Sequence, residues 1–282
     1  MITMLADKTS HEAHSLLPKG RNVLGSSISD TSISDLSKLI ISSADAERRL
    51  TVAALALHGV TLGYRGPVFR SRLSSFDVLT PDGAPVALAA KWLYGGKGIR
   101  RVPGPDLTTS VLKLAATSAL PVFFFGSTSK TLDLMRKRLA SDLPDLRIAG
   151  ARPSMFRRTN QAEKEELQNE IINSGARILF VGLGCPRQEV WMHENAYALE
   201  MPIITVGAAF DFIAGSIPRA PQWMRKFGLE WLFRIRSERK RLLSRYLGTG
   251  PYFILGCLKQ VLVGPPNQAA VKPEEIHFEH FG

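Results

Sequence analysis

Cysteines and long apolar runs are both scarce in this 282-residue sequence. Its two cysteines, Cys185 and Cys257, are too few for a disulfide framework and fit a reducing compartment. No apolar run reaches the ~18 residues of a membrane span, because the longest candidate, YFILGCLKQVLVG, contains Lys259 and Gln260. The polar N-terminal stretch has no apolar segment typical of a secretory signal. We therefore expect a cytoplasmic protein, either soluble or held at a membrane surface.

Patterns of metal ligands are missing as well. The six histidines form no ligand cluster, and there is no D-x-D triplet of the kind that commonly holds a metal–nucleotide-sugar complex. A lone histidine such as His58, which ends the apolar run in LALHGV, is more often structural than catalytic. We expect no metal and no cofactor.

The segment FFFGSTSKT resembles a phosphate-binding P-loop only at Lys130 and Thr131. Ser129 replaces the required glycine before the lysine, and the earlier glycine is missing. The sequence therefore argues against a P-loop, and we expect Ser127 or Ser129 to cap the helix that follows.

The segment GLGCPRQE begins like a dinucleotide-binding fingerprint, with Gly182 and Gly184 in G-x-G spacing. Arg187 holds the third glycine position, so a tight turn that opens a helix explains the segment at least as well as NAD(P) binding. With Pro186 at the first helical position, backbone N–H groups of that helix would form an anion site. Arg187 and Gln188 would face the same crevice.

Apolar runs alternate with amphipathic segments along most of the chain, which predicts a parallel sheet covered on both faces. The class is α/β, Rossmann-like and doubly wound, with a mostly parallel sheet. LSSFDVLTPDG ends an expected strand, and TVAALALHGV is a strand or a helix start. The other expected strands are LPVFFFG, LRIAG, RILFVGLG and PIITVGAAF. Helices are expected in SDTSISDLSKLIISSADAERR, APVALAAKWL, KTLDLMRKRLASDL, AEKEELQNEIINSG and RQEVWMHENAYAL.

Three regions are expected. Residues 1–20 form a flexible extension, residues 21–215 a Rossmann-like catalytic core, and residues 216–282 a basic, amphipathic C-terminal appendage and tail. The appendage is expected to be helical, and only PYFILG has weak strand character.

Ligands of such a sheet bind beyond the carboxyl ends of its strands, so acidic residues there are candidates for function. Asp82 lies in a Pro-Asp-Gly turn before a helix, where turn and capping preferences alone would explain it. The alternative is a general base at the mouth of the sheet. Asp211, in AAFDFIAG, is either a helix cap or a ligand-binding acid.

The segment from Arg219 to Tyr246 holds nine Lys or Arg and two Glu, which is +7 of the chain's net +11. It also contains two Trp, two Phe and a Tyr. So basic and aromatic a segment suits nucleic acid, a membrane surface or an anionic small molecule. An amphipathic helix with a solvated basic face is the plainest alternative.

Four blocks resemble the WecG/TagA/CpsF family of bacterial glycosyltransferases: RVPGPDL, GLGCPRQEVWM, VGAAFDFIAGSIPRAPQWM and GLEWLFRIRSERKR. The resemblance runs in order from about residue 22 to about residue 250. It implies transfer of a sugar from a UDP-sugar to a polyprenyl-pyrophosphate-linked saccharide at the inner face of the membrane. It also implies inversion at the anomeric carbon and no metal.

The resemblance also assigns residues. Asp82 matches the family's proposed base and Gln188 its active-site glutamine. The residues expected to bind substrate or nucleotide are Arg101, Gly104, Asp106, Gly126, Gly184, Pro186, Arg187, Gly207, Asp211 and Arg219. Those expected at the diphosphate or the membrane are Arg234, Arg236, Arg239, Arg241 and Arg245.

The sequence departs from the family pattern at three places. Ala54-Leu55-Ala56 replaces a T-x-N, Ala208-Ala209 a glycine pair, and Glu238-Arg239 an EP pair. Because Ala54 and Ala56 remove polar groups from a pocket wall, we expect UDP-glucose to be preferred over UDP-N-acetylmannosamine.

The expected partners are therefore a UDP-sugar, a lipid-linked acceptor and an anionic membrane surface, with a homo-oligomer left open. We expect no nucleic acid as a partner, since no nucleic-acid-binding motif occurs. A nucleic-acid-binding α/β protein and an NAD(P)-dependent dehydrogenase with a degenerate fingerprint remain as alternative functions.

Overall fold

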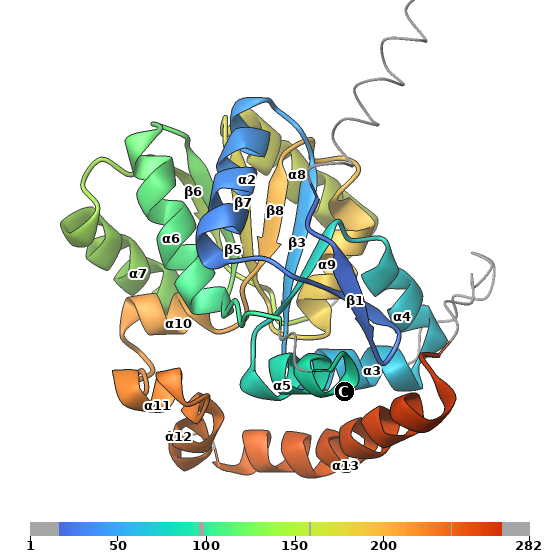
Figure 1. Cartoon of the computed structure of the whole chain (residues 1–282). Helices are drawn as coiled ribbons and strands as arrows, with labels where there is room; N and C mark the ends of the chain where they lie inside the picture. The colour runs from blue at the N-terminus through green and yellow to red at the C-terminus, as the bar shows by residue number, and fades with distance from the viewer. Residues whose placement is uncertain (1–16, 96–98, 158, 238, 267–282) are drawn as a thin grey trace, which may run out of the picture.

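The computed structural model describes residues 17–95, 99–157, 159–237 and 239–266. An eight-stranded sheet runs in the order β1-β2-β4-β3-β8-β7-β5-β6. Every neighbouring pair is parallel except β1 and β2, which form an antiparallel hairpin at one edge (Figure 1). The predicted Rossmann-like α/β fold with a mostly parallel sheet is confirmed.

The strands are β1 Gly20–Val23, β2 Ser26–Ser29, β3 Leu50–Leu55, β4 Val78–Pro81, β5 Val122–Gly126, β6 Ile148–Arg152, β7 Ile178–Gly182 and β8 Pro202–Thr205. The helices of the core are α2 Ile33–Asp45, α3 Leu57–Arg65, α4 Pro67–Ser74, α5 Ala84–Leu93, α6 Gly104–Thr117, α7 Ser129–Asp142, α8 Gln161–Asn173, α9 Arg187–Asn195 and α10 Ala209–Ala214. The appendage contributes α11 Gln222–Lys226, α12 Glu230–Ser237 and α13 Arg239–Val263.

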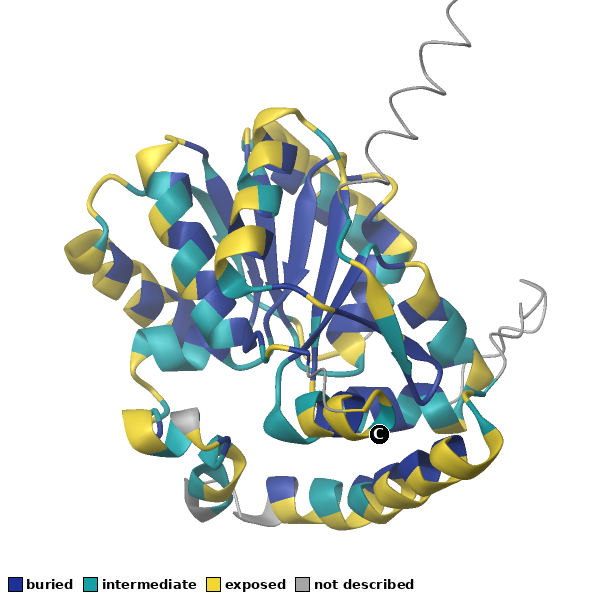
Figure 2. Cartoon of the chain, viewed as in Figure 1, coloured by how far each residue is buried: buried dark blue, intermediate teal, exposed yellow. Residues whose placement is uncertain are grey.

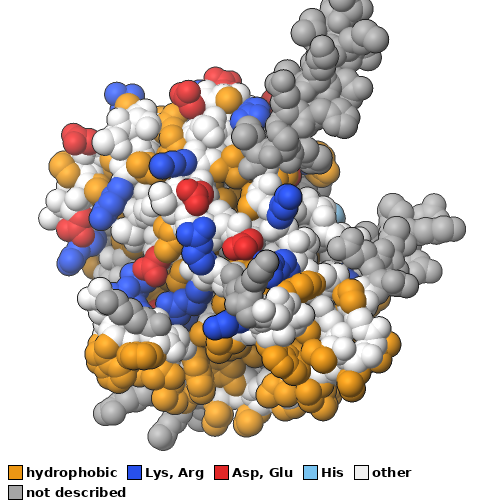
Figure 3. Space-filling view, in the orientation of Figure 1, with side chains coloured by type: hydrophobic (Ala, Val, Ile, Leu, Met, Phe, Trp, Pro, Cys, Tyr) orange, Lys and Arg blue, Asp and Glu red, His pale blue; other side chains and the backbone are white. Residues whose placement is uncertain are grey.

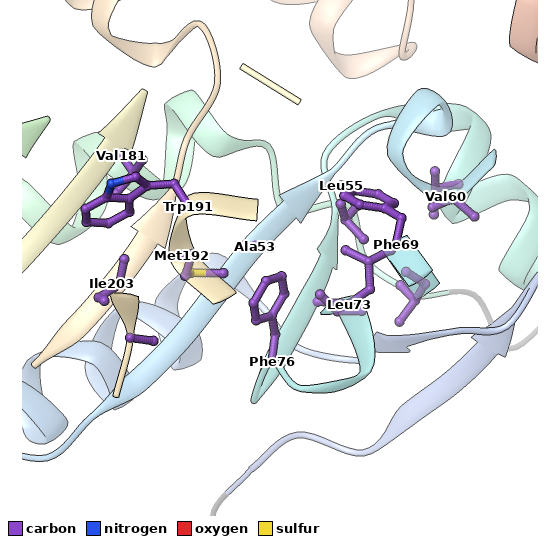
Figure 4. Packing of buried hydrophobic residues seen from close by; sticks show 14 of the residues in the cluster. Ala53, Leu55, Val60, Phe69, Leu73, Phe76, Val181, Trp191, Met192 and Ile203 are labelled. Carbon is purple, nitrogen blue, oxygen red and sulfur yellow. The ribbon is translucent and has the colours of Figure 1, made fainter. Parts of the chain in front are cut away.

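Two hydrophobic clusters cover the two faces of the sheet. Side chains alternate along each strand, so in β3 Ala53 and Leu55 join one cluster while Leu50 and Val52 join the other. The first cluster packs against α3, α4, α5, α8 and α9, and the second against α2, α6, α7 and α10. Figure 4 shows residues of the first cluster from α3, α4 and α9 beside those of the strands. Because both faces are buried, polar chemistry is confined to the ends of the strands.

Several local predictions need correction. The strand predicted in PIITVGAAF ends at Thr205, and its last residues open α10 instead. PYFILG is not a strand but lies inside α13. The cap of α7 is Thr128, whose Oγ1 accepts the Thr131 N–H, rather than either neighbouring serine. Pro186 is the N-cap of α9, one residue before the position predicted for it.

The hairpin of β1 and β2 was not predicted, since its strands are short and largely polar. Leu17, within the predicted flexible extension, packs against the second cluster, and Gly20 already belongs to β1. Residues 1–16 of that extension and residues 267–282 of the predicted tail lie outside the described residues.

The predicted helical character of the appendage is confirmed. Its three helices lie beyond the carboxyl ends of the strands, and α13 packs against α3 and α5 (Figure 1). The side of α13 that faces the core is buried, with Phe253 and Cys257 in the first cluster, while its outer side is exposed (Figure 2). None of the helices in the described ranges is long and apolar enough to cross a bilayer.

Candidate active site

Asp82 follows β4 at the carboxyl edge of the sheet. Its backbone N–H donates to Leu55 O of the neighbouring strand at 3.0 Å, which fixes the turn. Its Oδ1 accepts the N–H of Gly104, the first residue of α6, at 2.7 Å. Among the described residues, nothing hydrogen-bonds to its Oδ2. Asp82 is therefore a half-buried carboxylate with one oxygen anchored and one available.

The environment of Asp82 raises the pKa of this carboxyl group. Burial is the main cause, the Gly104 N–H opposes it, and the nearby carboxylate of Glu230 adds to it. The guanidinium groups of Arg234 and Arg101 act in the opposite direction. A proton acceptor that is more basic than an ordinary aspartate, flanked by cations, suits general base catalysis.

Two arginines share one carboxylate next to this turn, and a third arginine is bonded to the backbone of one of them. Asp106 Oδ1 accepts a close hydrogen bond from Arg219 Nη2 and lies 3.6 Å from Arg225 Nη1. Arg101 Nη2 donates to the backbone oxygen of Arg225 at 2.7 Å. In the described part of the chain, the buried Nε groups of Arg219 and Arg225 have no hydrogen-bond partner. Asp106 is thus shared by two guanidinium groups, while Arg101, held beside them, acts on the carboxyl group of Asp82.

Phe212 connects this group to α12. The guanidinium of Arg219 lies 5.9 Å and that of Arg234 5.5 Å from the centre of its ring, distances typical of cation–π contacts. The preceding residue, Asp211, accepts from Thr131 Oγ1 and from Ser216 Oγ, each at 3.4 Å. Asp211 thus lies at the same edge as the arginines, within the first turn of α10.

Gln188 is buried, and both the oxygen and the nitrogen of its side-chain amide make internal hydrogen bonds. Its Oε1 accepts two backbone N–H groups, from Gly184 after β7 and from Gly207 after β8, each at 3.1 Å. Its Nε2 donates to Glu189 Oε1 at 2.9 Å. One amide therefore holds together two turns that the sequence separates, and the catalytic role that the resemblance implies for Gln188 stays a prediction.

Glu189 is fully buried beneath these turns. Burial raises its pKa to about 7, although hydrogen bonds with Gln188 and Cys185 oppose that rise. The guanidinium of Arg245, on α13, also favours the charged form of Glu189. The same cation, together with burial as the larger cause, lowers the pKa of His58 to about 4. Arg245 thus lies near Glu189, and so near Gln188, at the carboxyl edge of the sheet, together with His58.

The glycines of the expected site occupy two kinds of position. Gly126 has φ +122°, and a Cβ there would lie 2.5 Å from Gly182 O, so only glycine fits this close contact between β5 and β7. Gly184 and Gly207 also have positive φ, but a Cβ at either would meet nothing within 4 Å. These two turns are therefore open on the side where a ligand would approach.

Of the remaining predicted residues, the structure describes the position of some and not of others. Arg187 is exposed at the first position of α9, after the cis peptide bond between Cys185 and Pro186. The side chains of Arg236, Arg239 and Arg241 lie outside what the structure describes. Within the described ranges, no three His, Cys, Asp or Glu side chains gather as metal ligands, and a metal-free reaction stays a prediction.

Three residues at this edge were not predicted from the sequence: Glu189, Arg225 and Glu230. Glu189 and Glu230 stand inside the quoted blocks, directly after Gln188 and before Trp231, so they could have been found there. Arg225 had no signal beyond its place in the basic segment.

The raised pKa of Glu189 predicts a specific dependence of stability on pH. Between the ordinary value of 4.5 and about 7, the unfolded chain releases a proton that the folded chain keeps. The free energy of unfolding should therefore fall as pH rises through this window, by on the order of 3 kcal/mol from this group. Glu189→Gln should remove that part of the fall, measured by urea unfolding at pH 5 and pH 7.5. The exposed Glu165→Gln is the control, and equal pH dependence in both variants would contradict the assignment.

Comparisons with known proteins identify the family of this chain. The model of the glycosyl transferase WecG/TagA/CpsF family matches residues 21–266. One curated relative, from Bacillus spizizenii, is 29% identical over 211 residues, which cover 74% of this chain and 76% of the relative. That relative is named N-acetylglucosaminyldiphosphoundecaprenol N-acetyl-beta-D-mannosaminyltransferase. The resemblance that the sequence suggested is confirmed: the chain is a glycosyltransferase of the WecG/TagA/CpsF family.

Proposed function

We propose that this enzyme transfers a hexose or N-acetylhexosamine from a UDP-sugar to a polyprenyl-pyrophosphate-linked saccharide, with inversion and without a metal. The observation that carries the proposal is a carboxylate with one available oxygen, Asp82, beside a group of arginine side chains. The Bacillus relative, named for transfer to a diphosphoundecaprenol-linked sugar, supports the class of acceptor. Membership of a glycosyltransferase family decides against the nucleic-acid-binding and dehydrogenase alternatives.

In this mechanism Asp82 is the general base. Its free Oδ2 takes the proton of the acceptor hydroxyl as that oxygen attacks the anomeric carbon of the donor. The Gly104 N–H on Oδ1 keeps the carboxylate oriented. Attack from the side opposite to the departing diphosphate inverts the anomeric configuration in one displacement.

The departing UDP carries its negative charge on the diphosphate. Arg219 and Arg225 have buried Nε donors with no partner among the described residues, and they share Asp106 as their acid. Arg234 adds a further cation near Asp82. Guanidinium groups bind phosphate oxygens through paired donors, so this group of arginines can stabilise the leaving group in the role that a metal has elsewhere.

We place the enzyme at the cytoplasmic face of the membrane through the outer side of its appendage. Leu243, Leu247, Ile254, Leu258 and Val261 recur at helical spacing on α13, and all five are exposed. We call these five residues the α13 stripe. In Figure 3, hydrophobic side chains line the lower edge of the molecule, where the appendage lies. An apolar stripe that directly follows a basic segment suits a helix that lies in a membrane interface.

Within this proposal, the first prediction tests Asp82 as the general base. Asp82→Asn keeps the shape of the side chain but removes its basicity, so sugar transfer should fall by roughly 10²–10⁴-fold. Transfer is measured with purified protein, a UDP-sugar and a short-chain lipid-linked acceptor, and circular dichroism checks that the variant is folded. Asp142→Asn, an exposed aspartate on α7, is the matched control. A folded Asp82→Asn enzyme with normal turnover would refute the role.

The second prediction concerns the donor. Ala54 and Ala56 offer no hydrogen bond at the end of β3, and Ala56 leaves α3 without a side-chain cap. Without polar groups to hold an N-acetyl amide, UDP-glucose should be used roughly tenfold better than UDP-N-acetylmannosamine, the worth of one lost hydrogen bond. The measurement is a competition between the two donors. An Ala54→Thr/Ala56→Asn enzyme should shift toward the N-acetylated donor. Preference of the unaltered enzyme for UDP-N-acetylmannosamine would disprove the idea.

The third prediction tests the membrane surface. Ile254→Glu/Leu258→Glu places two charges in the α13 stripe, so co-sedimentation with vesicles of anionic phospholipid should be lost. Ile172→Glu, at an exposed apolar residue of α8, is the control and should bind like the unaltered protein. The α13 stripe is not the membrane contact if the unaltered protein does not bind anionic vesicles at low salt. The same conclusion follows if the unaltered protein, the double variant and the control variant all bind alike.

A further inference from the structure

A single side chain makes two hydrogen bonds between the C-terminal end of α13 and the β1–β2 hairpin. Gln260 Oε1 accepts the N–H of Leu24 at 2.8 Å, and its Nε2 donates to Asn22 O at 2.7 Å. Gln260 is 7% exposed and Leu24 is fully buried. Both ends of one amide are therefore satisfied by the backbone of a turn more than 230 residues away in the sequence.

Apolar packing makes the same contact close. A Cβ at Gly256 would lie 3.0 Å from both Leu24 Cδ2 and Tyr64 Cε1, so the missing side chain lets α13 approach the hairpin and α3. One turn earlier, the Tyr252 ring carries the guanidinium of Arg65 at 4.1 Å. We call the contacts of Gln260 and Gly256 with the hairpin and α3 the hairpin anchor.

The near end of the appendage is attached by different chemistry. There, Asp106 pairs with Arg219 and Arg225, and Arg101 holds the backbone oxygen of Arg225. Between this ion-pair group and the hairpin anchor lie α12, with Arg234, and the first half of α13, with Arg245. The segment that brings these two cations to the core is thus fixed at both ends.

An α-helix transmits the position of one end to the other. From Gln260 to Arg245 the helix spans 15 residues, or about 22 Å at 1.5 Å per residue. Pro251 lies between these two residues and removes one backbone hydrogen bond of the helix, so the packing of α13 on α3 and α5 has to keep the axis direction past it. A helix packed in this way and pinned at its last turns keeps its direction, which decides where its first turns lie. Releasing the pinned end would let the cations move away from the edge of the sheet without altering any residue there.

We propose that Gln260 is a positioning residue for sugar transfer: the hairpin anchor sets the direction of α13 and so places the appendage cations at the active-site edge. The inference rests on the proposed function. Gln260 touches no reacting group, since its partners belong to the hairpin on the outer edge of the sheet.

The test compares two variants of full-length protein. Gln260→Met keeps the size of the side chain but removes both hydrogen bonds. Thr249→Val removes a similarly buried hydrogen bond of the same helix, from Thr249 Oγ1 to Arg245 O, without touching the hairpin. Hydrogen exchange of the Leu24 amide and of α12–α13 is measured beside the kcat of transfer and the KM of the UDP-sugar.

We expect Gln260→Met to speed exchange at Leu24 and in α12, and to lower kcat at least tenfold with KM changed less than threefold. Thr249→Val should leave exchange at Leu24 and kcat as they are. The inference is overturned if exchange at Leu24 rises in Gln260→Met while kcat stays within twofold, because the anchor then only adds stability. Unchanged exchange at Leu24 also overturns it, since the amide then does not hold the hairpin.

If Gln260→Met does not fold, Gly256→Ala takes its place. Alanine favours the helix itself, yet its methyl group would lie 3.0 Å from the side chains of Leu24 and Tyr64, so either these side chains or α13 must shift. A loss of kcat is therefore expected from a helix that is locally more stable. Hydrogen exchange does not depend on catalysis. An unaltered protein that is protected at Leu24 but transfers no sugar from any UDP-sugar would therefore refute the proposed function, and not the anchor.

Discussion

Burial of both faces of the sheet is the constraint on which the rest of this structure depends. The central strands carry apolar side chains on both faces of the sheet, and helices cover both faces. Charged side chains that belong to the sheet can therefore reach water only where the strands end. Asp82, Gly184 and Gly207 follow β4, β7 and β8 at the same edge. Their backbone N–H groups and carboxylates must be satisfied there, by each other or by a ligand. The Gln188 amide satisfies two of them at once, and it thereby fixes how far apart two turns lie.

The second constraint is charge. Arginines of the appendage would repel one another at the edge of the sheet unless an acidic residue of the core paired with them. Asp106 forms ion pairs with Arg219 and Arg225, and these pairs join the appendage to the core. The pairing is incomplete, because one carboxylate is shared by two guanidinium groups. An incomplete pairing of this kind leaves room for an anion, whereas a complete ion pair would have closed the site.

The sequence predicted those parts of the fold that one local pattern determines. Val122–Gly126 and Ile178–Gly182 are continuous apolar runs before helices, and both are strands. The hairpin was missed because GRNV and SSIS lack an apolar run, and its burial comes from packing with distant residues. The same reason hid the role of Gln188, since spacing along the chain does not show that Gly184 and Gly207 meet at one amide. Asp82 was predicted as a site residue, but the Gly104 N–H that orients it comes from a segment 22 residues later.

The two sides of α13 unite these constraints. Its inner side must match the core closely, and the absence of a side chain at Gly256 together with the buried amide of Gln260 provides that match. Its outer side has no such partner among the described residues and is apolar, which in water alone would be costly. In the proposed docking, a helix with one side fitted to the core and the other suited to lipid would link the depth of docking to the position of Arg234 and Arg245. The bilayer would then present the proposed acceptor and also press α13 onto the hairpin and α3, so the site would be most complete where its lipid-linked substrate lies.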